Sequence, residues 1–314
     1  MTSLFDGIFF EDLNAMYLLE IIFSFFTLKE ILQLRLVCKL FNQVFKEKWC
    51  KANTIKLNNK IRDDQFKRFY FLKNINLSHC SYITDKGLSY LTGVHTINLT
   101  CCSQITDEGL FHLSGVHTIV LSHCDKITDK GLSYLSGVHT ICLIFCYKIT
   151  DKGLSYLSGV KNIDLSYCYY ITDKGLSYLS GVHTIILYDC FQITDKGLSY
   201  LTGIHTINIR RCNKITDEGL LYLRGVKKID LTDCKKITDK GLSYLNGVNE
   251  ITITECHKIT IKGLSYLYRA HIMNVFFCGQ ILHKELYDLS ITHRININSH
   301  ESSLNNPWIL FKHK

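Results

Sequence analysis

Cysteine recurs in this chain at a constant interval. Ten of its fourteen cysteines, from Cys80 to Cys278, are spaced by 22 residues. Thiols can bridge or bind zinc, and parallel strands one repeat apart would hold equivalent residues about 4.8 Å from one another. A zinc site, however, needs several ligands that converge tetrahedrally, commonly with a local C-x2-4-C spacing, whereas stacked repeats place their cysteines in a line. The spacing therefore favours buried structural thiols, and we expect no metal and no cofactor.

Histidine follows the same interval at another position of the repeat. The residues are His95, His117, His139, His183 and His205, with Lys161 in the intervening copy. They come at the start of the expected strands. The simplest interpretation is that they are solvated side chains copied by duplication, and the weaker alternative is a metal-binding or pH-sensing role. The chain has no nucleophile elbow, phosphate-binding glycine loop, H-E-x-x-H or kinase signature. We therefore expect no catalytic residue and no enzymatic activity.

The 22-residue unit reads V-x-x-I-x-L-x-x-C-x-x-I-T-D-K-G-L-S-Y-L-S-G. Ile97 and Leu99 alternate with polar neighbours, which predicts a short strand with one buried face. Thr106 and Asp107 offer side-chain oxygens to the amides of the next turn, which predicts the N-cap of a short helix. Gly115 suits the left-handed position after that helix. Each unit is therefore expected to be one strand, a turn that buries the cysteine, and one helix.

The segment from Val94 to Ile105 fits the pattern L-x-x-L-x-L-x-x-N/C-x-L, and a period of 22 lies within the range of leucine-rich repeats. The C-x-x-I-T-D-x-G-L form resembles the cysteine-containing leucine-rich repeats that commonly follow an F-box. This resemblance implies an α/β solenoid: a leucine-rich-repeat horseshoe with a parallel β-sheet on the concave face and short helices or turns outside.

Five segments follow from the pattern. We expect an F-box-like helical module at 1–51, an N-terminal capping half-repeat at 52–72, 22-residue repeats at 73–267, a degenerate C-terminal repeat at 268–297, and a tail at 298–314. After Cys256 the unit first loses its aspartate, at Ile261, and then both glycines, at Arg269 and Glu285.

The first 51 residues have apolar residues at helical spacing, and Thr27 followed by Glu30 forms a capping box. Residues 31–41, I-L-Q-L-R-L-V-C-K-L-F, together with I-I-F-S-F-F at 21–26, resemble an F-box. The resemblance implies that this module docks a Skp-type adaptor, and through it a cullin-RING ligase. The implied adaptor contacts are Leu13, Leu18, Ile21, Ile22, Leu28, Leu32, Val37, Cys38 and Phe41. The alternative is a module that only caps the open end of the repeats.

Variation between copies is concentrated around the strands, while the Ser of G-L-S-Y-L hardly changes. Random drift after duplication is the alternative, but drift would have altered the exposed helix positions as well. We therefore expect the concave face to bind a target protein, with an aromatic centre beside arginine, as in binding hot spots. The predicted contacts are Ile144, Phe145, Tyr147, Tyr167, Tyr169, Ile186, Tyr188, Asp189, Phe191, Arg210, Arg211 and Asp233.

The net charge of +8 comes from lysines spread over nearly every repeat, so it does not demand a polyanionic partner. The apolar N-terminal stretch is interrupted by acidic residues and has no basic leader, which predicts neither a signal peptide nor a membrane span. We expect an intracellular protein, cytoplasmic or nuclear, with free thiols. As the F-box resemblance implies, it would be a substrate-recognition subunit of a Skp-adaptor/cullin/F-box ubiquitin ligase. A scaffold or decoy without ubiquitin transfer is the alternative, and nucleic-acid binding is a weaker third reading.

Overall fold

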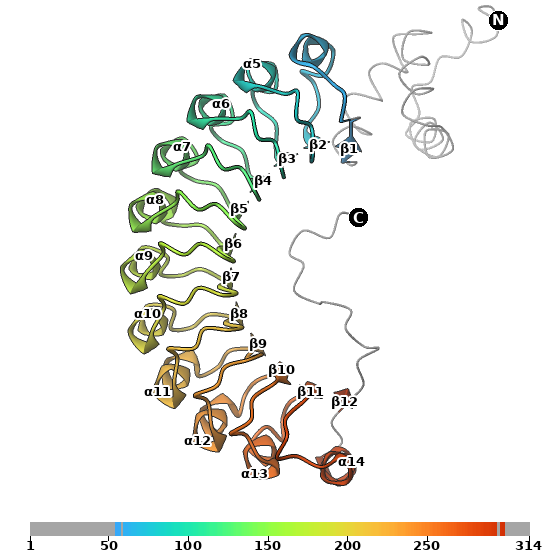
Figure 1. Cartoon of the computed structure of the whole chain (residues 1–314), viewed down its shortest axis with the longest axis vertical. Coiled ribbons are helices and arrows are strands. Elements are labelled where there is room, and N and C mark those ends of the chain that lie inside the picture. Colours follow the sequence, from blue (N-terminus) through green and yellow to red (C-terminus); the bar gives the residue numbers. More distant parts are fainter. Residues whose placement is uncertain (1–53, 58, 294–295, 299–314) are drawn as a thin grey trace, which may run out of the picture.

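The computed structural model describes residues 54–57, 59–293 and 296–298. Their chain coils into an arc with the strands on the inner side and the helices on the outer side (Figure 1). All strands of the described residues belong to one parallel sheet of twelve, ordered β1 to β12 as in the sequence. The predicted solenoid is therefore confirmed. The predicted F-box-like module at 1–51 lies outside the described residues.

The strands are short because the chain turns away from the sheet after a few residues. They are β1 (Ile55–Lys56), β2 (Asn74–Asn76), β3 (Thr96–Asn98), β4 (Thr118–Val120), β5 (Thr140–Cys142), β6 (Asn162–Asp164), β7 (Thr184–Ile186), β8 (Thr206–Asn208), β9 (Lys228–Asp230), β10 (Glu250–Thr254), β11 (Ile272–Phe276) and β12 (Asn296–Asn298). From β2 to β11 no residue is inserted between copies, so each strand pairs in register 22 residues on, as Ile97 does with Ile119. Equivalent residues therefore form rows across the sheet.

Most helices have only four or five residues. They are α5 (Asp85–Leu88), α6 (Asp107–Phe111), α7 (Asp129–Ser133), α8 (Asp151–Leu154), α9 (Asp173–Ser177), α10 (Asp195–Ser199), α11 (Asp217–Leu220), α12 (Asp239–Leu242), α13 (Ile261–Ser265) and the longer α14 (His283–His293). Short 3-10 helices are η2 (Asp63–Arg68), η3 (Ser155–Leu157), η4 (Leu221–Leu223) and η5 (Ser243–Leu245). Threonine caps the helices from α5 to α13, as predicted: the Thr106 hydroxyl accepts a hydrogen bond from the Glu108 amide at 3.3 Å.

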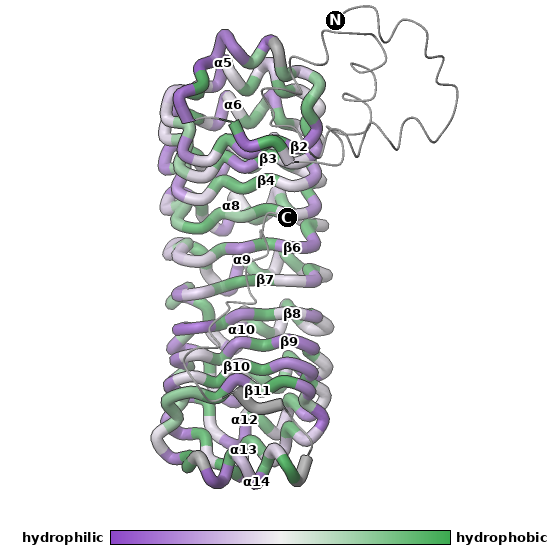
Figure 2. The backbone as a smooth tube through the Cα atoms, turned by 90° about the vertical axis from the view of Figure 1, so that its right-hand side faces the viewer, coloured by the Kyte–Doolittle hydropathy of each residue, from purple (hydrophilic) through white to green (hydrophobic). Residues whose placement is uncertain are grey.

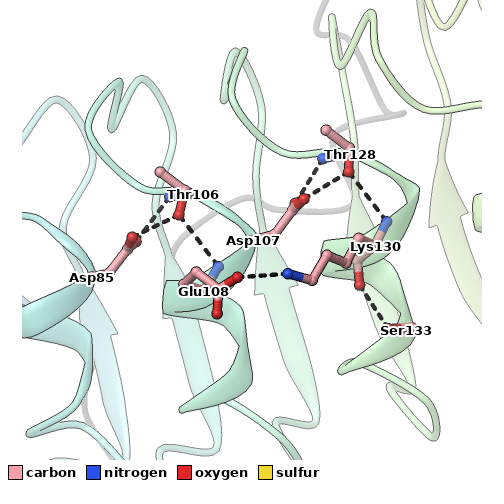
Figure 3. A network of polar contacts seen from close by, with 7 residues as sticks. All are labelled: Asp85, Thr106, Asp107, Glu108, Thr128, Lys130 and Ser133. Atoms are coloured by element: carbon pink, nitrogen blue, oxygen red, sulfur yellow. Dashed lines mark hydrogen bonds and ion pairs between the residues drawn. The ribbon is translucent and has the colours of Figure 1, made fainter.

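The aspartate after each capping threonine has a different role from the predicted one. Asp107 does not cap its own helix but binds the next repeat: the Thr128 amide and hydroxyl donate to its carboxylate at 2.8 and 2.6 Å (Figure 3). We call this pair the Asp–Thr clip. It recurs between successive repeats from Asp63 with Thr84 to Asp239 with Thr260. The carboxylate thus holds the cap residue of its neighbour.

The clip also explains the glycine two residues after each aspartate. A Cβ added to Gly109 would overlap Asp85 Oδ1, the carboxylate oxygen supplied by the preceding repeat. The later glycine of the unit has the predicted left-handed conformation, with φ +83° at Gly115. The two repeated glycines therefore serve different purposes: one leaves room for a neighbour, and the other allows a turn.

One continuous apolar core runs the length of the described array, and each turn of the coil alternates between hydrophobic and hydrophilic stretches (Figure 2). Cys102 is fully buried, and its thiol donates to the Leu77 carbonyl at 3.1 Å, which confirms the predicted structural role. Burial raises the pKa of Cys124 to about 12, so this thiol stays protonated. All cysteines in the described part of the chain are free. No helix there is long and apolar enough to cross a membrane.

Candidate functional site: an aromatic surface at the strand ends

The residue before each of the ten regularly spaced cysteines has a left-handed backbone. The ten are His79, Cys101, His123, Phe145, Tyr167, Asp189, Arg211, Asp233, Glu255 and Phe277, with φ from 53° to 63°. They turn the chain out of its strand towards the outer helix. Branching at Cβ is disfavoured in this conformation, and none of the ten is Val, Ile or Thr. The position therefore varies in chemistry while its backbone stays the same.

Aromatic rings at this position stack from repeat to repeat. The Phe145 and Tyr167 rings lie 4.0 Å apart between centroids, with 9° between their planes. The His123 ring stacks on Phe145 at 4.5 Å. In the next repeat the left-handed residue is Asp189, and the ring of the preceding Tyr188 lies 4.8 Å from that of Tyr167. Burial and the hydrogen bond to Tyr188 raise the pKa of Tyr167 to about 12, so its hydroxyl remains protonated.

A second row of rings lies two residues further along each turn. Tyr147 and Tyr169 are separated by 5.7 Å, and Tyr169 and Phe191 by 5.3 Å. An edge-on contact at 5.9 Å joins Phe145 to Tyr147, so the two rows form one patch. We call Phe145, Tyr147, Tyr167, Tyr169, Tyr188 and Phe191 the aromatic surface. Tyr147 and Phe191 are 42% and 45% exposed, so the patch offers large rings to a partner.

Arginines adjoin the aromatic surface on its C-terminal side. The Arg210 guanidinium carbon lies 4.9 Å from the Tyr188 ring centroid, and that of Arg211 lies at 5.8 Å. Arg211 also forms an ion pair with Asp233 at 3.4 Å, and Lys235 approaches the same carboxylate at 3.5 Å. Arg210 Nε is buried without a hydrogen-bond acceptor among the described residues. A buried donor of this kind can donate to a ligand oxygen that reaches it, at little further desolvation cost to the donor.

A carboxyl group lies in the strand that leads to this surface. Asp164 is 5% exposed in β6, and its Oδ1 accepts from the Ser166 amide at 2.9 Å and the Ser166 hydroxyl at 2.6 Å. Burial raises its pKa to about 6, although the two hydrogen bonds oppose that rise.

Two predicted target contacts are buried, and the prediction that they are accessible is wrong. Ile186 is 4% exposed because it lies in β7 between Asp164 of β6 and Asn208 of β8, which cover it from both sides. Asp233 is 8% exposed and is occupied by Arg211 and Lys235. Of the remaining predicted contacts, Ile144 and Asp189 are half-buried beside the aromatic rows.

The histidines form a separate row at the start of the strands. His95 stacks on His117 and His117 on His139, each at 4.5 Å, and each Nδ1 lies within hydrogen-bonding distance of the next threonine hydroxyl. Burial, followed by the two neighbouring histidines, lowers the pKa of His117. Within residues 54–293 and 296–298, no group of three His, Cys, Asp or Glu side chains is arranged to hold a metal ion.

Two protein families match the chain. The F-box domain matches residues 16–53, and the Leucine Rich repeat matches residues 71–91, 94–114, 116–136, 204–223 and 226–245. This chain is an F-box/leucine-rich-repeat protein. Families with this pair of modules are typically non-catalytic adaptors. No curated protein matches the chain.

Solved structures show the same solenoid at low sequence identity. Rad7, in the Rad7 and Elc1 complex in yeast, is similar over 87% of the F-box/leucine-rich-repeat chain and 90% of its own, with a TM-score of 0.52 and 14% identity. Internalin InlF from Listeria monocytogenes is similar over 74% of this chain and 68% of its own, with a TM-score of 0.53 and 16% identity. TLR13, in its complex with ssRNA13, has the same TM-score and identity over 65% of this chain and 32% of its own.

Reasoning from the sequence missed two features of this F-box/leucine-rich-repeat protein. The left-handed turn was not predicted, although the absence of Val, Ile and Thr from that position is a signal for it. The Asp–Thr clip was also missed. Its signal is that both members disappear together: where Ile261 replaces the aspartate, Leu282 replaces the threonine of the following repeat.

Proposed function

We propose that this protein is a substrate-recognition subunit of a Skp-adaptor/cullin/F-box ubiquitin ligase. Residues 12–51 dock the adaptor, and the aromatic surface with Arg210 and Arg211 binds the target protein. The observation that carries the proposal is the combination of an F-box match at 16–53 with a rigid repeat array that presents stacked rings beside arginine. Free cysteines throughout the described array fit action in the cytoplasm or nucleus.

The contribution of such a subunit is proximity. Holding a target beside the charged conjugating enzyme converts a bimolecular encounter into an effectively unimolecular one. The repeat array suits this task because the Asp–Thr clips and the continuous core link each repeat to the next. A target bound at the strand ends therefore stays at a constant distance from the first repeat.

Adaptor binding tests the first half of the proposal. Co-expression with a Skp-type adaptor is expected to yield a complex that survives purification, and Leu32→Glu or Val37→Glu should abolish it because charged side chains replace apolar contacts. Leu221→Glu is the matched control, since Leu221 is a partly exposed leucine of the outer surface. Intact wild-type protein that never retains an adaptor would contradict the proposal.

The second candidate function is a scaffold or decoy that uses the same target surface without ubiquitin transfer. It predicts target binding with no change in the target's half-life, whereas the ligase predicts a shorter half-life that is restored by Leu32→Glu. Pulse-chase measurement of a captured target separates the two. Binding of nucleic acid with a steep salt dependence would instead support the third reading of the sequence.

A further inference from the structure

We infer that the target segment is an extended peptide that combines an apolar or aromatic anchor with an aspartate or glutamate about four residues away. The anchor lies on the aromatic surface, and the carboxylate binds Arg210. This inference rests on the proposed function, since it names the chemistry of the target at the same surface. The expected ligand is an acidic peptide, and preferential binding of a basic peptide or of nucleic acid would overturn the inference.

The aromatic surface provides the place for the anchor. Its rings are already stacked on one another, as Phe145 is on Tyr167 at 4.0 Å and Tyr147 on Tyr169 at 5.7 Å. Rings that are held in place before binding lose little conformational freedom when a partner covers them. Their exposed faces and edges are mostly apolar, so a Leu, Phe or Trp side chain fits there better than a charged one.

Arg210 provides the place for the carboxylate. Its Nε is buried and has no acceptor within the described residues. Its guanidinium carbon lies 4.9 Å from the Tyr188 ring centroid, and a guanidinium can bind a carboxylate through two parallel N–H donors. The buried carboxylate of Asp230 accepts hydrogen bonds from Thr232 and Asn208.

Arg210 differs from the neighbouring cations because it has no ion pair among the described residues. Arg211 and Lys235 both lie beside the Asp233 carboxylate, at 3.4 and 3.5 Å. Arg210 acts on the buried Asp230 carboxylate only through its charge. An incoming carboxylate can therefore pair with the Arg210 guanidinium, whereas an incoming lysine is repelled by it.

The spacing between anchor and carboxylate follows from the stack. Successive separations from Phe145 to Tyr167, Tyr188 and the Arg210 guanidinium are 4.0, 4.8 and 4.9 Å. The whole path is thus at most about 14 Å, which about four residues of extended chain span at roughly 3.3 Å each. A peptide running along the arc would place its anchor on Phe145 and Tyr167 and its acid on Arg210.

The test uses the full chain and short fluorescent peptides of Gly and Ser that carry one Phe-Leu anchor. A single Asp is placed on either side of the anchor at each spacing from adjacent to about seven residues, and matched peptides carry Asn or Lys instead. Fluorescence anisotropy should show binding about tenfold tighter for Asp than for Asn at a spacing of about four residues, and weaker binding for Lys. The order of affinities, Asp above Asn above Lys, is the expected result.

Arg210→Gln should remove the advantage of Asp over Asn, so that the two peptides bind this variant alike. Arg224→Gln is the matched control, because Arg224 makes the same kind of contact with a tyrosine ring, at 5.3 Å from Tyr244, on the outer side of the array. Tyr167→Asn should weaken all the peptides, since it removes the middle of the stack. Asn is chosen because it tolerates the left-handed backbone.

Equal affinity for Asp and Asn, preference for Lys, no binding of any peptide, or an unchanged Asp advantage in Arg210→Gln would each overturn the inference. Adaptor binding and target half-life are measured separately, so the proposed function can stand when the acidic-peptide inference fails. Failure of the wild-type protein to bind an adaptor would contradict the proposed function without affecting the measured preference for acidic peptides.

Discussion

Replacement of Asp164 by asparagine should stabilise the protein at neutral pH. Asp164 lies in β6 between Cys142 of β5 and Ile186 of β7 and is almost fully buried. Other repeats show that asparagine fits this position: Asn98 Oδ1 accepts from the Thr100 amide at 2.9 Å, as Asp164 Oδ1 does from the Ser166 amide. Asp164→Asn therefore keeps the amide hydrogen bond and removes only the charge.

The pKa of Asp164 sets the size and direction of the effect. Burial raises it from its ordinary value of 3.8 to about 6, and a difference of this size corresponds to about 3 kcal/mol of folding free energy. Between these two values the folded state binds more protons than the unfolded state, so the stability of the wild type falls as pH rises. The cost of the charge is absent below about pH 4 and complete above about pH 6.

Urea unfolding of the wild type and Asp164→Asn at about pH 7.5 and about pH 4 measures this cost. The variant should be more stable by up to about 3 kcal/mol at the higher pH and indistinguishable at the lower pH. The reverse change, Asn98→Asp, should destabilise at the higher pH only. A variant that is no more stable than wild type at about pH 7.5, or a gain that persists unchanged in acid, would refute the reasoning.

Three further outcomes follow from the repeat geometry. Asp151→Ala should lower stability by about 2 kcal/mol, because the Thr172 amide and hydroxyl lose their acceptor, while Asp151→Asn should cost less; urea midpoints check both. Tyr167→Val should cost about 1–2 kcal/mol through its branched Cβ at φ 61°, and a melting temperature equal to that of Tyr167→Asn would contradict this. Iodoacetamide should label half-buried Cys101 in the native protein and fully buried Cys102 only after unfolding. Tandem mass spectrometry of the peptide that contains both cysteines measures which of them is labelled, and labelling of Cys102 in the native protein would contradict this.

The repeat period was sufficient to predict the fold. An interval of 22 residues without insertions leaves one way for neighbouring strands to pair, with Ile97 against Ile119, and the alternation of Ile and Leu identifies the buried face. The same interval places like side chains one strand apart. The aromatic rows beginning at Phe145 and Tyr147 could therefore be proposed as one surface from the sequence.

Contacts between repeats were harder to predict. Asp107 follows a capping threonine, and local reasoning assigns it to its own helix, yet its partner Thr128 lies 21 residues further along the chain. The choice between the two is made only when helices α6 and α7 stack side by side. The sequence does carry a trace of this contact, since Ile261 and Leu282 replace the aspartate and the threonine of one pair together. That joint replacement can be interpreted only once the two positions are known to be in contact.

The sequence by itself determined the solenoid, its inner sheet and the residue types on its variable positions, because a strict period constrains every copy in the same way. Only the tertiary structure decided which of these residues a partner can reach. Alternation shows that Ile186 points away from the core, yet it is buried between Asp164 and Asn208, its neighbours in the same row of the sheet. The turn after the strand instead carries Phe145, Tyr167 and their neighbours to the surface, because its left-handed backbone directs them past the sheet.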